Sequence, residues 1–380
     1  SEKVHSVVEV ILENHDKIVE GVLQESLEEI AYKALPADLV DEVRVDVGDM
    51  KIGDVIRVKD LPIYASKDTI DYDFKVLVPA PTVNSISCEF AKPGSEVTLI
   101  GDYFIDDPNV PLTITMAGNV EVTNITNITK TAVSFILPDN APAGYINVKS
   151  IYGTGRSKFR YYDTRNILFD WDGSHGGMAI AHGWRDGSKV LREADENSID
   201  GAYICLTGAL DGAIGATWAE DEFSFNYWPE PSAGYPELSA RPEFAELLEE
   251  YGVNGLQLKF EVNIPSSNPW QSCALQVMFT GNDVVTYATG TNAYFSDTNV
   301  PRGLWLPWKN TGSYDTGGKW TTVSMNLSEF NKTHEGNKCD RTFDKTMLTG
   351  LTFFVWAGGV EGKDCNPVIM IDNIRVVPIE

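Results

Sequence analysis

The chain divides into three stretches that differ in how apolar and polar positions alternate. Over residues 1–79, apolar side chains alternate with acidic and basic ones, as in VHSVVEVILEN and EVRVDVGDMKIGDVIRVKDL. A period of two is typical of strands with one buried face. Over residues 80–162, short apolar runs are separated by Pro and Gly at intervals of roughly eight to twelve residues, which predicts an all-β sandwich.

Residues 163–380 contain longer apolar runs and longer loops. Five segments are expected to be strands: NGLQLKFEVNI, CALQVMFTG, WTTVSMNL, LTFFVWAG and PVIMIDNIRVVPI. The segment RPEFAELLEEYG predicts a short helix, because Pro242 lies in its first turn and Gly252 ends it. Mostly β sequence of this length predicts a single jelly-roll-like β-sandwich. We therefore expect an all-β chain with a β-rich domain at 1–79, an immunoglobulin-like sandwich at 80–162 and the jelly-roll-like sandwich last.

One predicted strand continues into a loop that is rich in aromatic residues. In FSFNYWPEPSAGYPEL, Phe223 and Phe225 alternate with polar residues, and Tyr227 and Trp228 then follow each other directly. Neighbouring side chains of a strand point to opposite faces, so one core cannot bury both rings. The pattern favours exposure of these two rings, on a backbone that the following prolines restrict.

Composition and charge disfavour several classes of partner. The 380 residues carry a formal net charge of −25, which disfavours binding to nucleic acid and to anionic membranes. No apolar run reaches about eighteen residues, the length that a membrane-spanning helix needs. We find no signal peptide and no lipid-attachment cysteine after Ser1, so any membrane association is expected through an anchor that this chain lacks.

The cysteines form no recognisable metal or disulfide motif. Five cysteines are present and no C-x-x-C pair occurs among them. We expect most of them to be small buried side chains, and a disulfide between Cys339 and Cys365 stays open.

Motifs for catalysis and for metal binding are mostly missing. DGSHGG places Asp172 where a nucleophile elbow needs glycine, and no phosphate-binding glycine motif is present. The spacing of Asp170, Asp172, His175 and His182 matches no standard metal site, so a network of turns is favoured. A carboxylate pair for glycoside hydrolysis could come from acidic residues near the aromatic loop, but 55 acidic residues make such proximity common. These residues are Glu220, Asp221, Glu222, Glu230 and Glu237.

All nine tryptophans lie in residues 163–380. An aromatic ring can cover the C–H face of a sugar while polar neighbours bond its hydroxyl groups, and this requires rings on exposed loops. Trp171, Trp320 and Trp356 adjoin strands and are expected in the core, whereas Trp218 is ambiguous. The candidate ligand-binding residues are Trp184, Arg185, Tyr227, Trp228, Trp270, Trp305 and Trp308.

Two resemblances concern the first and second domains. GVLQESLEEIAYKALPADLVDEVRVDVGDMKIGDVIRVKDL resembles the C-terminal (CTC) β-domain of the bacterial 5S-rRNA-binding ribosomal protein family. Such a domain joined to an unrelated module indicates an engineered fusion with residues 1–79 as carrier, and a natural mosaic is the alternative. PGSEVTLIGDYF and PAGYINVKSIYGTG resemble an IPT/TIG immunoglobulin-like domain, which usually acts as a spacer.

A third resemblance concerns the last domain. FDWDGSHGGMAIAHGWRDG, LWLPWKNTGSYDTGGKWTTVSMNLSEF and VIMIDNIRV resemble the SusE/SusF-like C-terminal glycan-binding domain of Bacteroidetes surface glycan-binding protein B. The resemblance implies a lipoprotein on the extracellular face of the outer membrane that passes glycan to a SusC/SusD-like import complex. It is also compatible with a structural calcium near Asp372.

These observations predict a non-catalytic protein that binds a neutral polysaccharide, a β-glucan or a hemicellulose such as xyloglucan or mixed-linkage glucan. We expect no catalytic residue and no cofactor. Two alternatives stay open: a glycoside hydrolase or lyase of sandwich fold, and a protein-binding adhesin.

Overall fold

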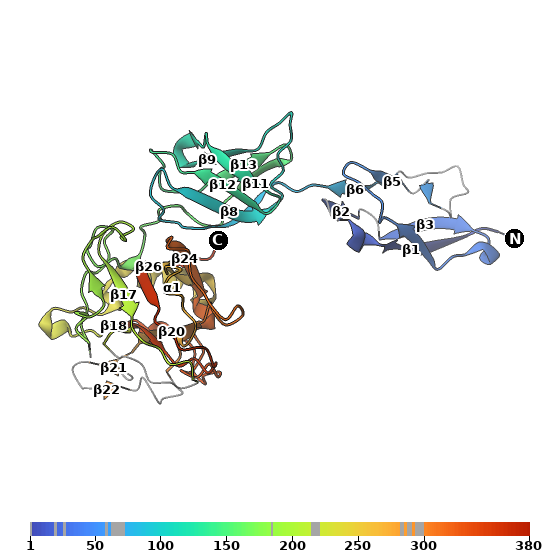
Figure 1. The fold of residues 1–380 in the computed structure, drawn as a ribbon. Coiled ribbons are helices and arrows are strands. Elements are labelled where there is room, and N and C mark those ends of the chain that lie inside the picture. The colour runs from blue at the N-terminus through green and yellow to red at the C-terminus, as the bar shows by residue number, and fades with distance from the viewer. Residues whose placement is uncertain are drawn as a thin grey trace.

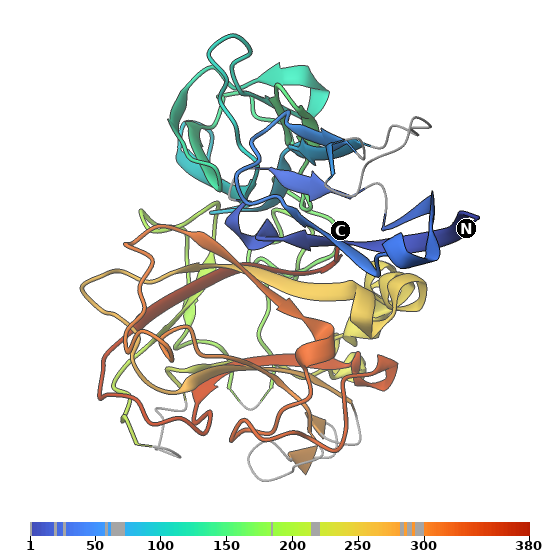
Figure 2. The same ribbon diagram turned by 90° about the vertical axis from the view of Figure 1, so that its right-hand side faces the viewer.

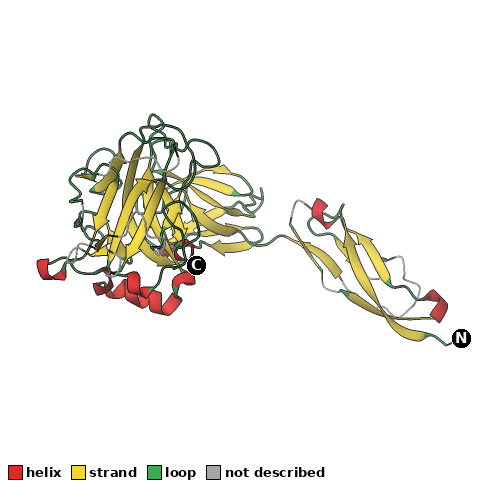
Figure 3. Cartoon of the chain, turned by 90° about the horizontal axis from the view of Figure 1, so that it is seen from below, coloured by secondary structure: helices red, strands yellow, loops and turns green. Residues whose placement is uncertain are grey.

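The computed structural model describes most of the chain and shows it to be nearly all β. The described residues are 2–18, 21–25, 28–57, 60–61, 73–183, 185–213, 221–281, 285–286, 291–292 and 300–380. Strands dominate the cartoon in Figure 3. Over the described ranges there is one α-helix, α1 (Pro242–Tyr251), and Gly252 after it has a positive φ of 65°. The predictions of an all-β chain and of this helix are confirmed.

The N-terminal unit consists of two three-stranded sheets, shown in blue in Figure 1. The first sheet has the order β3 (Glu29–Ala34), β1 (Val4–Glu13), β4 (Glu42–Asp46). The second has the order β2 (Val22–Gln24), β6 (Asp73–Leu77), β5 (Val55–Arg57). Alternate positions such as Val8 and Val10 of β1 are buried in a small core, as the period-two pattern predicts.

The second unit, here called the spacer, is a sandwich of two four-stranded sheets. One has the order β10 (Val120–Glu121), β9 (Thr113–Met116), β13 (Asn147–Ser150), β14 (Gly153–Arg156). The other has the order β11 (Ile125–Ile128), β12 (Ala132–Ile136), β8 (Glu96–Asp102), β7 (Thr82–Ile86). Two glycines allow close backbone approach: an added Cβ at Gly101 would collide with the carbonyl oxygen of Thr82, and one at Gly155 with that of Pro81.

The C-terminal unit is a larger sandwich. Its first sheet has the order β16 (Leu191–Arg192), β17 (Tyr203–Thr207), β26 (Val368–Pro378), β19 (Leu256–Asn263), β24 (Thr321–Asn326), with β15 (Ile167–Phe169) also paired to β26. Its second sheet has the order β18 (Ser224–Tyr227), β25 (Gly350–Trp356), β20 (Ala274–Thr280), β23 (Gly303–Trp305). A separate hairpin joins β21 (Val285–Thr286) to β22 (Thr291–Asn292). Figure 2 shows the two sheets as layers, with α1 at one end.

Four charged side chains are buried where the spacer meets the C-terminal unit. Glu89 of the spacer contacts Arg375 Nη2 at 2.7 Å and Lys259 Nζ at 2.5 Å, and Arg375 Nη1 contacts Glu261 at 2.7 Å. All four residues are at most 5% exposed. We call Glu89, Lys259, Glu261 and Arg375 the buried quartet. Charges are buried at low cost only when they are paired, so the quartet favours one orientation of the two units.

Further contacts extend the joint beyond the quartet. The Arg375 guanidinium lies 4.7 Å from the ring centre of Phe90, and Lys92 Nζ donates to the Ser198 carbonyl at 3.1 Å. Ile167 and Ile199 of the C-terminal unit belong to the hydrophobic core of the spacer. The spacer and the C-terminal unit therefore share part of one core.

Candidate functional site

Four of the predicted ligand-binding rings are buried. The exposed fraction is 0% for Tyr227 and Trp270, 3% for Trp308 and 6% for Trp228. A ring that is covered on both faces cannot stack on a sugar. The prediction that these rings form an exposed platform is therefore wrong.

The physical reason is clearest for Tyr227 and Trp228. The two rings do point to opposite faces of the sheet: Tyr227 belongs to the core between the sheets, and Trp228 lies on the outer face. The outer face is covered as well, since an added Cβ at Gly183 would lie 3.1 Å from the Trp228 ring. The inference failed because it assumed that only one face of this sheet is buried.

Polar atoms of the buried rings have partners inside the protein. Trp308 Nε1 donates to the Cys273 carbonyl at 2.8 Å, and Tyr227 Oη donates to the Pro236 carbonyl at 2.6 Å. Burial raises the pKa of Tyr227 to about 12, so the phenol stays protonated. Such bonds are those expected of core aromatics.

The remaining tryptophans are buried, partly buried or outside the described residues. Trp305 is partly buried and packs edge-on against Trp270, at 5.5 Å between ring centres. Trp171 is buried, as predicted, whereas Trp320 and Trp356 are only partly buried. Trp184 and Trp218 lie outside the described residues, as does Glu220.

A partly exposed aromatic and polar cluster lies beside the buried Trp228. We call it the loop patch, and its members are His182, Arg185, Asp221, Glu230 and Tyr235. The His182 ring stacks on Tyr235, with ring centres 3.6 Å apart and an angle of 6° between the planes. His182 Nε2 lies 3.0 Å from Glu230 Oε2, and Arg185 Nε lies 2.7 Å from Asp221 Oδ1.

Backbone pairing holds the loop patch in place. His182 forms a parallel bridge with Tyr227 at the end of β18, and Trp228 N donates to the His182 carbonyl at 2.5 Å. Glu230 and Tyr235 exchange two backbone hydrogen bonds, of 2.9 and 3.1 Å, across a tight turn that contains Pro231. The patch residues therefore stand on loops that are anchored to a buried strand, which suits a preformed site.

Sequence reasoning missed His182 as a stacking ring and missed Tyr235. Tyr235 lies in the same loop as Trp228, between Gly234 and Pro236, where no strand pattern would bury it. A tyrosine at such a loop position is a candidate for an exposed ring.

A second aromatic pair lies at the far end of β25. The ring of His334 stacks on Trp356, with ring centres 5.0 Å apart and an angle of 13°. The Gln276 amide donates to both backbone carbonyls, at 3.1 Å to His334 and 2.8 Å to Trp356. Burial, followed by the charge of Arg302, lowers the pKa of His334, so its ring is neutral at neutral pH.

Polar side chains line the outer face of the sheet between the two pairs. Asn226 Nδ2 donates to Ser224 Oγ at 2.8 Å, and Thr352 Oγ1 donates to Asn226 Oδ1 at 3.1 Å. β25 runs from Gly350, beside Trp228, to Trp356, a length of about 20 Å. The outer face thus has an aromatic pair near each end, and the polar side chains between them are buried and hydrogen-bonded to one another.

Two of the residues considered for a metal site, Asp170 and Asp172, organise turns. The Asp170 carboxylate accepts backbone N–H groups of Gly173, His175 and Gly177, at 2.9, 2.7 and 3.2 Å. Asp172 accepts from Ser174 N at 2.8 Å. No group of three or more His, Cys, Asp or Glu side chains in the described ranges is arranged to hold a metal ion.

Asp372 is fully buried in β26 and is not a solvated edge residue. Burial, and then the charge of Asp200, raise the pKa of Asp372 well above its usual range. Calcium takes about six to eight oxygen ligands, which include backbone and amide oxygens as well as carboxylates, and the expectation of a structural calcium near Asp372 stays a prediction. All five cysteines are buried, and no disulfide joins Cys339 to Cys365.

Comparison with known proteins decides the family. Residues 161–378, more than half of the chain, match the family model of the surface glycan-binding protein B xyloglucan binding domain. The chain belongs to this family. The crystal structure of surface glycan-binding protein B from Prevotella bryantii is similar, with a TM-score of 0.69 and 30% identity, covering 93% of this chain and 86% of that one.

Two further comparisons concern the other domains. An IPT/TIG domain-containing protein of Bacteroides ovatus is 30% identical over 312 residues, which are 80% of this chain and 54% of the relative. The chain thus spans about half the length of that relative. Residues 3–78 match the model of the C-terminal domain of ribosomal protein TL5. Large ribosomal subunit protein bL25 of Dictyoglomus thermophilum is 39% identical over 84 residues, 22% of this chain and 37% of the relative.

The resemblances inferred from the sequence are therefore confirmed for all three parts of the chain. The carrier role of residues 1–79 stays a prediction. In the described part of this family member, no helix is long and apolar enough to cross a membrane.

Proposed function

We propose that the chain binds a neutral plant-type polysaccharide at the loop patch, without catalysing a reaction on it. The observation that carries this proposal is the match of residues 161–378 to a xyloglucan-binding domain. The loop patch supplies the chemistry such a ligand requires: a Tyr235 ring to cover a sugar face and polar groups to bond its hydroxyls. A net charge of −25 is compatible with a neutral polymer.

Trp184, which lies outside the described residues, stays a proposed ligand-binding residue. Its neighbours along the chain, Gly183 and Arg185, lie against Trp228 and in the loop patch, respectively. We therefore keep Trp184 and Arg185 as ligand-binding residues and replace Tyr227 and Trp228 by Tyr235 and His182.

The expected affinity is that of a reversible binder. Each aromatic contact contributes on the order of 0.5–1.5 kcal/mol beyond the burial of its surface. Two or three rings and a few hydrogen bonds must offset the loss of rigid-body freedom, which gives a Kd between roughly 1 μM and 1 mM. Repeated sites along a long polymer would retain the protein on it.

The names of the relatives support a proposal about the cellular role. Relatives are named surface glycan-binding proteins, which supports a location at the cell surface. We propose that the natural protein lies on the extracellular face of the outer membrane and passes captured glycan to a SusC/SusD-like import complex. The joint built on the buried quartet would hold the binding unit in a fixed direction on its spacer.

Affinity gel electrophoresis tests the proposal. We expect xyloglucan or mixed-linkage glucan in the gel to slow the wild-type chain, and we expect Trp184→Ala and Tyr235→Ala to weaken the effect. Tyr251→Ala is the matched control, because Tyr251 is exposed at the end of α1 and lies outside the patch.

Two outcomes would contradict the proposal. If no neutral glycan slows the wild-type chain, the polysaccharide role fails, and the protein-binding alternative gains support. If prolonged incubation releases reducing ends, and Glu230→Gln abolishes that release, the protein is a glycoside hydrolase.

A further inference from the structure

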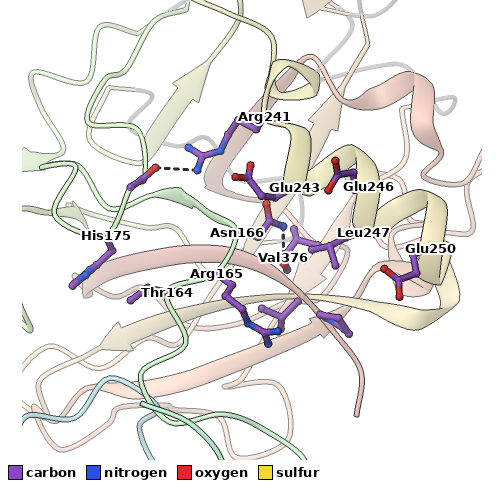
Figure 4. Close-up of a pocket in the computed structure, with 13 residues that line it drawn as sticks. Thr164, Arg165, Asn166, His175, Arg241, Glu243, Glu246, Leu247, Glu250 and Val376 are labelled. Atoms are coloured by element: carbon purple, nitrogen blue, oxygen red, sulfur yellow. Dashed lines mark hydrogen bonds between the residues drawn. The ribbon is translucent and has the colours of Figure 1, made fainter. Parts of the chain in front are cut away.

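A cavity of about 480 Å³ lies on the C-terminal unit, away from the residues of the loop patch. Three elements line it: the segment 164–166 that enters from the spacer, helix α1, and the end of β26. Figure 4 shows these elements around the cavity. Its volume falls in the range of about 300–1,000 Å³ that is usual for small-ligand pockets.

The lining combines both signs of charge with an apolar floor. Glu243, Glu246 and Glu250 stand along one side of α1, because positions three, four and seven residues apart share a helix face. Arg165 and Arg241 bring guanidinium groups to the same cavity. The apolar lining residues are Leu247, Val376, Val377 and Pro378.

Two buried polar atoms of the lining have no partner among the described residues. Asn166 is 7% exposed; its Nδ2 donates to the Val376 carbonyl at 2.7 Å, and its Oδ1 accepts nothing. Arg241 Nη2 donates to the Gly176 carbonyl at 2.9 Å, and its Nε is likewise unpaired. In Figure 4 the Asn166 oxygen is turned toward Arg241 and Glu243. A buried acceptor and a buried donor left unpaired cost free energy, which a bound ligand could recover.

The charges of the lining select the class of ligand. An anion would be repelled by the three carboxylates, and a cation would leave Arg241 Nε unmatched. The Arg165 guanidinium is already paired with the Asp163 carboxylate, at 2.7 Å, and does not decide the class of ligand. A hydroxyl group both donates and accepts, so neighbouring hydroxyls of a neutral, polyhydroxylated ligand can donate to Asn166 Oδ1 or a carboxylate and accept from Arg241.

We propose that this cavity is a second carbohydrate-binding site, which takes a single sugar residue or a disaccharide end by its hydroxyl groups. It differs from the loop patch in kind: recognition comes from hydrogen bonds over an aliphatic floor, and His175 is the only ring among its lining residues. The choice of sugar as ligand rests on the proposed function, whereas the site itself rests on the unpaired atoms and the charges.

The test uses the full chain with the loop patch disabled by Trp184→Ala and Tyr235→Ala. Saturation-transfer NMR with D-glucose, D-xylose, D-galactose and cellobiose as probes should still detect binding of at least one of them. We expect Arg241→Met and Glu246→Gln each to weaken that binding by about tenfold, since each removes a charge-assisted hydrogen bond.

Controls separate the site from general effects on the fold. Glu249→Gln alters a carboxylate on the same helix that does not line the cavity, so it should leave probe binding unchanged. Glu246 is exposed, so Glu246→Gln tests the site even if Arg241→Met fails to fold.

The outcomes distinguish this proposal from the proposed function. Absence of binding to all four probes in the patch-deficient chain overturns the second site, even if polysaccharide slows the wild-type chain. Equal losses in Glu246→Gln and Glu249→Gln also overturn it. If the wild type ignores every polysaccharide but Glu246→Gln still weakens probe binding, the proposed function fails and the cavity site stands.

Discussion

Charged side chains serve different purposes at the joint and at the loop patch. The buried quartet is at most 5% exposed, and each of its carboxylates faces a cation within 2.7 Å. At the patch, the side chain of Asp221 is 54% exposed and that of Glu230 is 27% exposed. The distances between the charged atoms are similar in the quartet and in the loop patch, but the side chains of the patch are far more exposed to water.

The difference in solvent contact decides what each set of charges can do. An ion pair in water contributes about 0–1 kcal/mol, so a ligand can replace one partner at little cost. Removal of one partner from a buried pair leaves a charge without water or counter-charge, which costs about 3–5 kcal/mol. The quartet is therefore suited to fix the orientation of two domains, and the patch is suited to exchange partners with a ligand.

The largest effect is expected from breaking the quartet. Arg375→Met leaves Glu261 and Glu89 buried with Lys259 as the one remaining cation of the quartet, and it should lower the free energy of unfolding by about 3–5 kcal/mol. Urea denaturation measures this change. Arg44→Met is the matched control, because Arg44 also pairs with two glutamates but its side chain is 56% exposed, and its loss should change the stability far less.

A result of under 1 kcal/mol for Arg375→Met would show that the quartet does not hold the joint. Glycan binding by the folded fraction of this variant should match the wild type, since Arg375 does not belong to the patch.

The next prediction tests whether Tyr227 is a core ring or a ligand-binding ring. Tyr227→Phe removes only the hydrogen bond from Oη to the Pro236 carbonyl, and it should cost about 0.5–1.5 kcal/mol of stability. Thermal unfolding measures the cost, and gel retardation by glycan should be unchanged. If the variant lost glycan retardation while its stability stayed unchanged, Tyr227 would be a ligand-binding residue.

Tyr235→Ala, in contrast to Tyr227→Phe, should weaken glycan binding and leave the stability nearly unchanged. Loss of a stacking ring should weaken glycan affinity by about two- to tenfold. Because Tyr235 is only partly buried, the free energy of unfolding should change by less than about 1 kcal/mol. Isothermal titration with a glucan oligosaccharide provides the affinity, and Tyr251→Ala provides the baseline. Unchanged affinity would mean that the His182–Tyr235 stack has no part in binding.

The smallest effect concerns pH at the edge of the joint. His175 Nε2 lies 2.8 Å from Asp200 Oδ2, and this bond, with the charges of Asp170 and Asp172, raises the pKa of His175. The stabilisation is complete below the unfolded pKa of about 6.5 and is lost as the pH rises through the higher folded pKa.

Because the His175 ring retains contact with solvent, we expect a loss of about 1 kcal/mol or less over that pH range. Denaturation curves at pH 6 and pH 9 measure the loss, and His175→Gln should abolish it. The same slope in wild type and variant would assign the pH dependence to other groups.

Much of the local structure could be predicted from the sequence. Alternating apolar positions predicted β1, longer apolar runs predicted β19, β20, β25 and β26, and the Pro and Gly at its two ends predicted α1. The family resemblance also rested on short motifs, because strand and loop sequences of this sandwich are specific enough to be recognised. These features depend on residues that are close together in the chain.

The candidate site depended on contacts that the chain alone does not show. From its strand position, Trp228 is expected on the outer face of the sheet. The segment around Gly183 packs against its ring there, which the sequence alone does not show. Tyr235 becomes a stacking ring only because His182, from another loop, lies beside it. The joint needs Glu89 and Arg375, which are far apart in sequence.

The sequence by itself determined the β architecture and the helix at Pro242–Tyr251. It also showed that three parts of the chain each resemble a different family, and it indicated the family of the C-terminal part. The tertiary structure decided which aromatic rings are exposed, which charges are buried in pairs, and that Asn166 and Arg241 line one cavity. The reason is physical: strand periodicity fixes which side of a sheet a residue faces, but burial depends on what packs against that side.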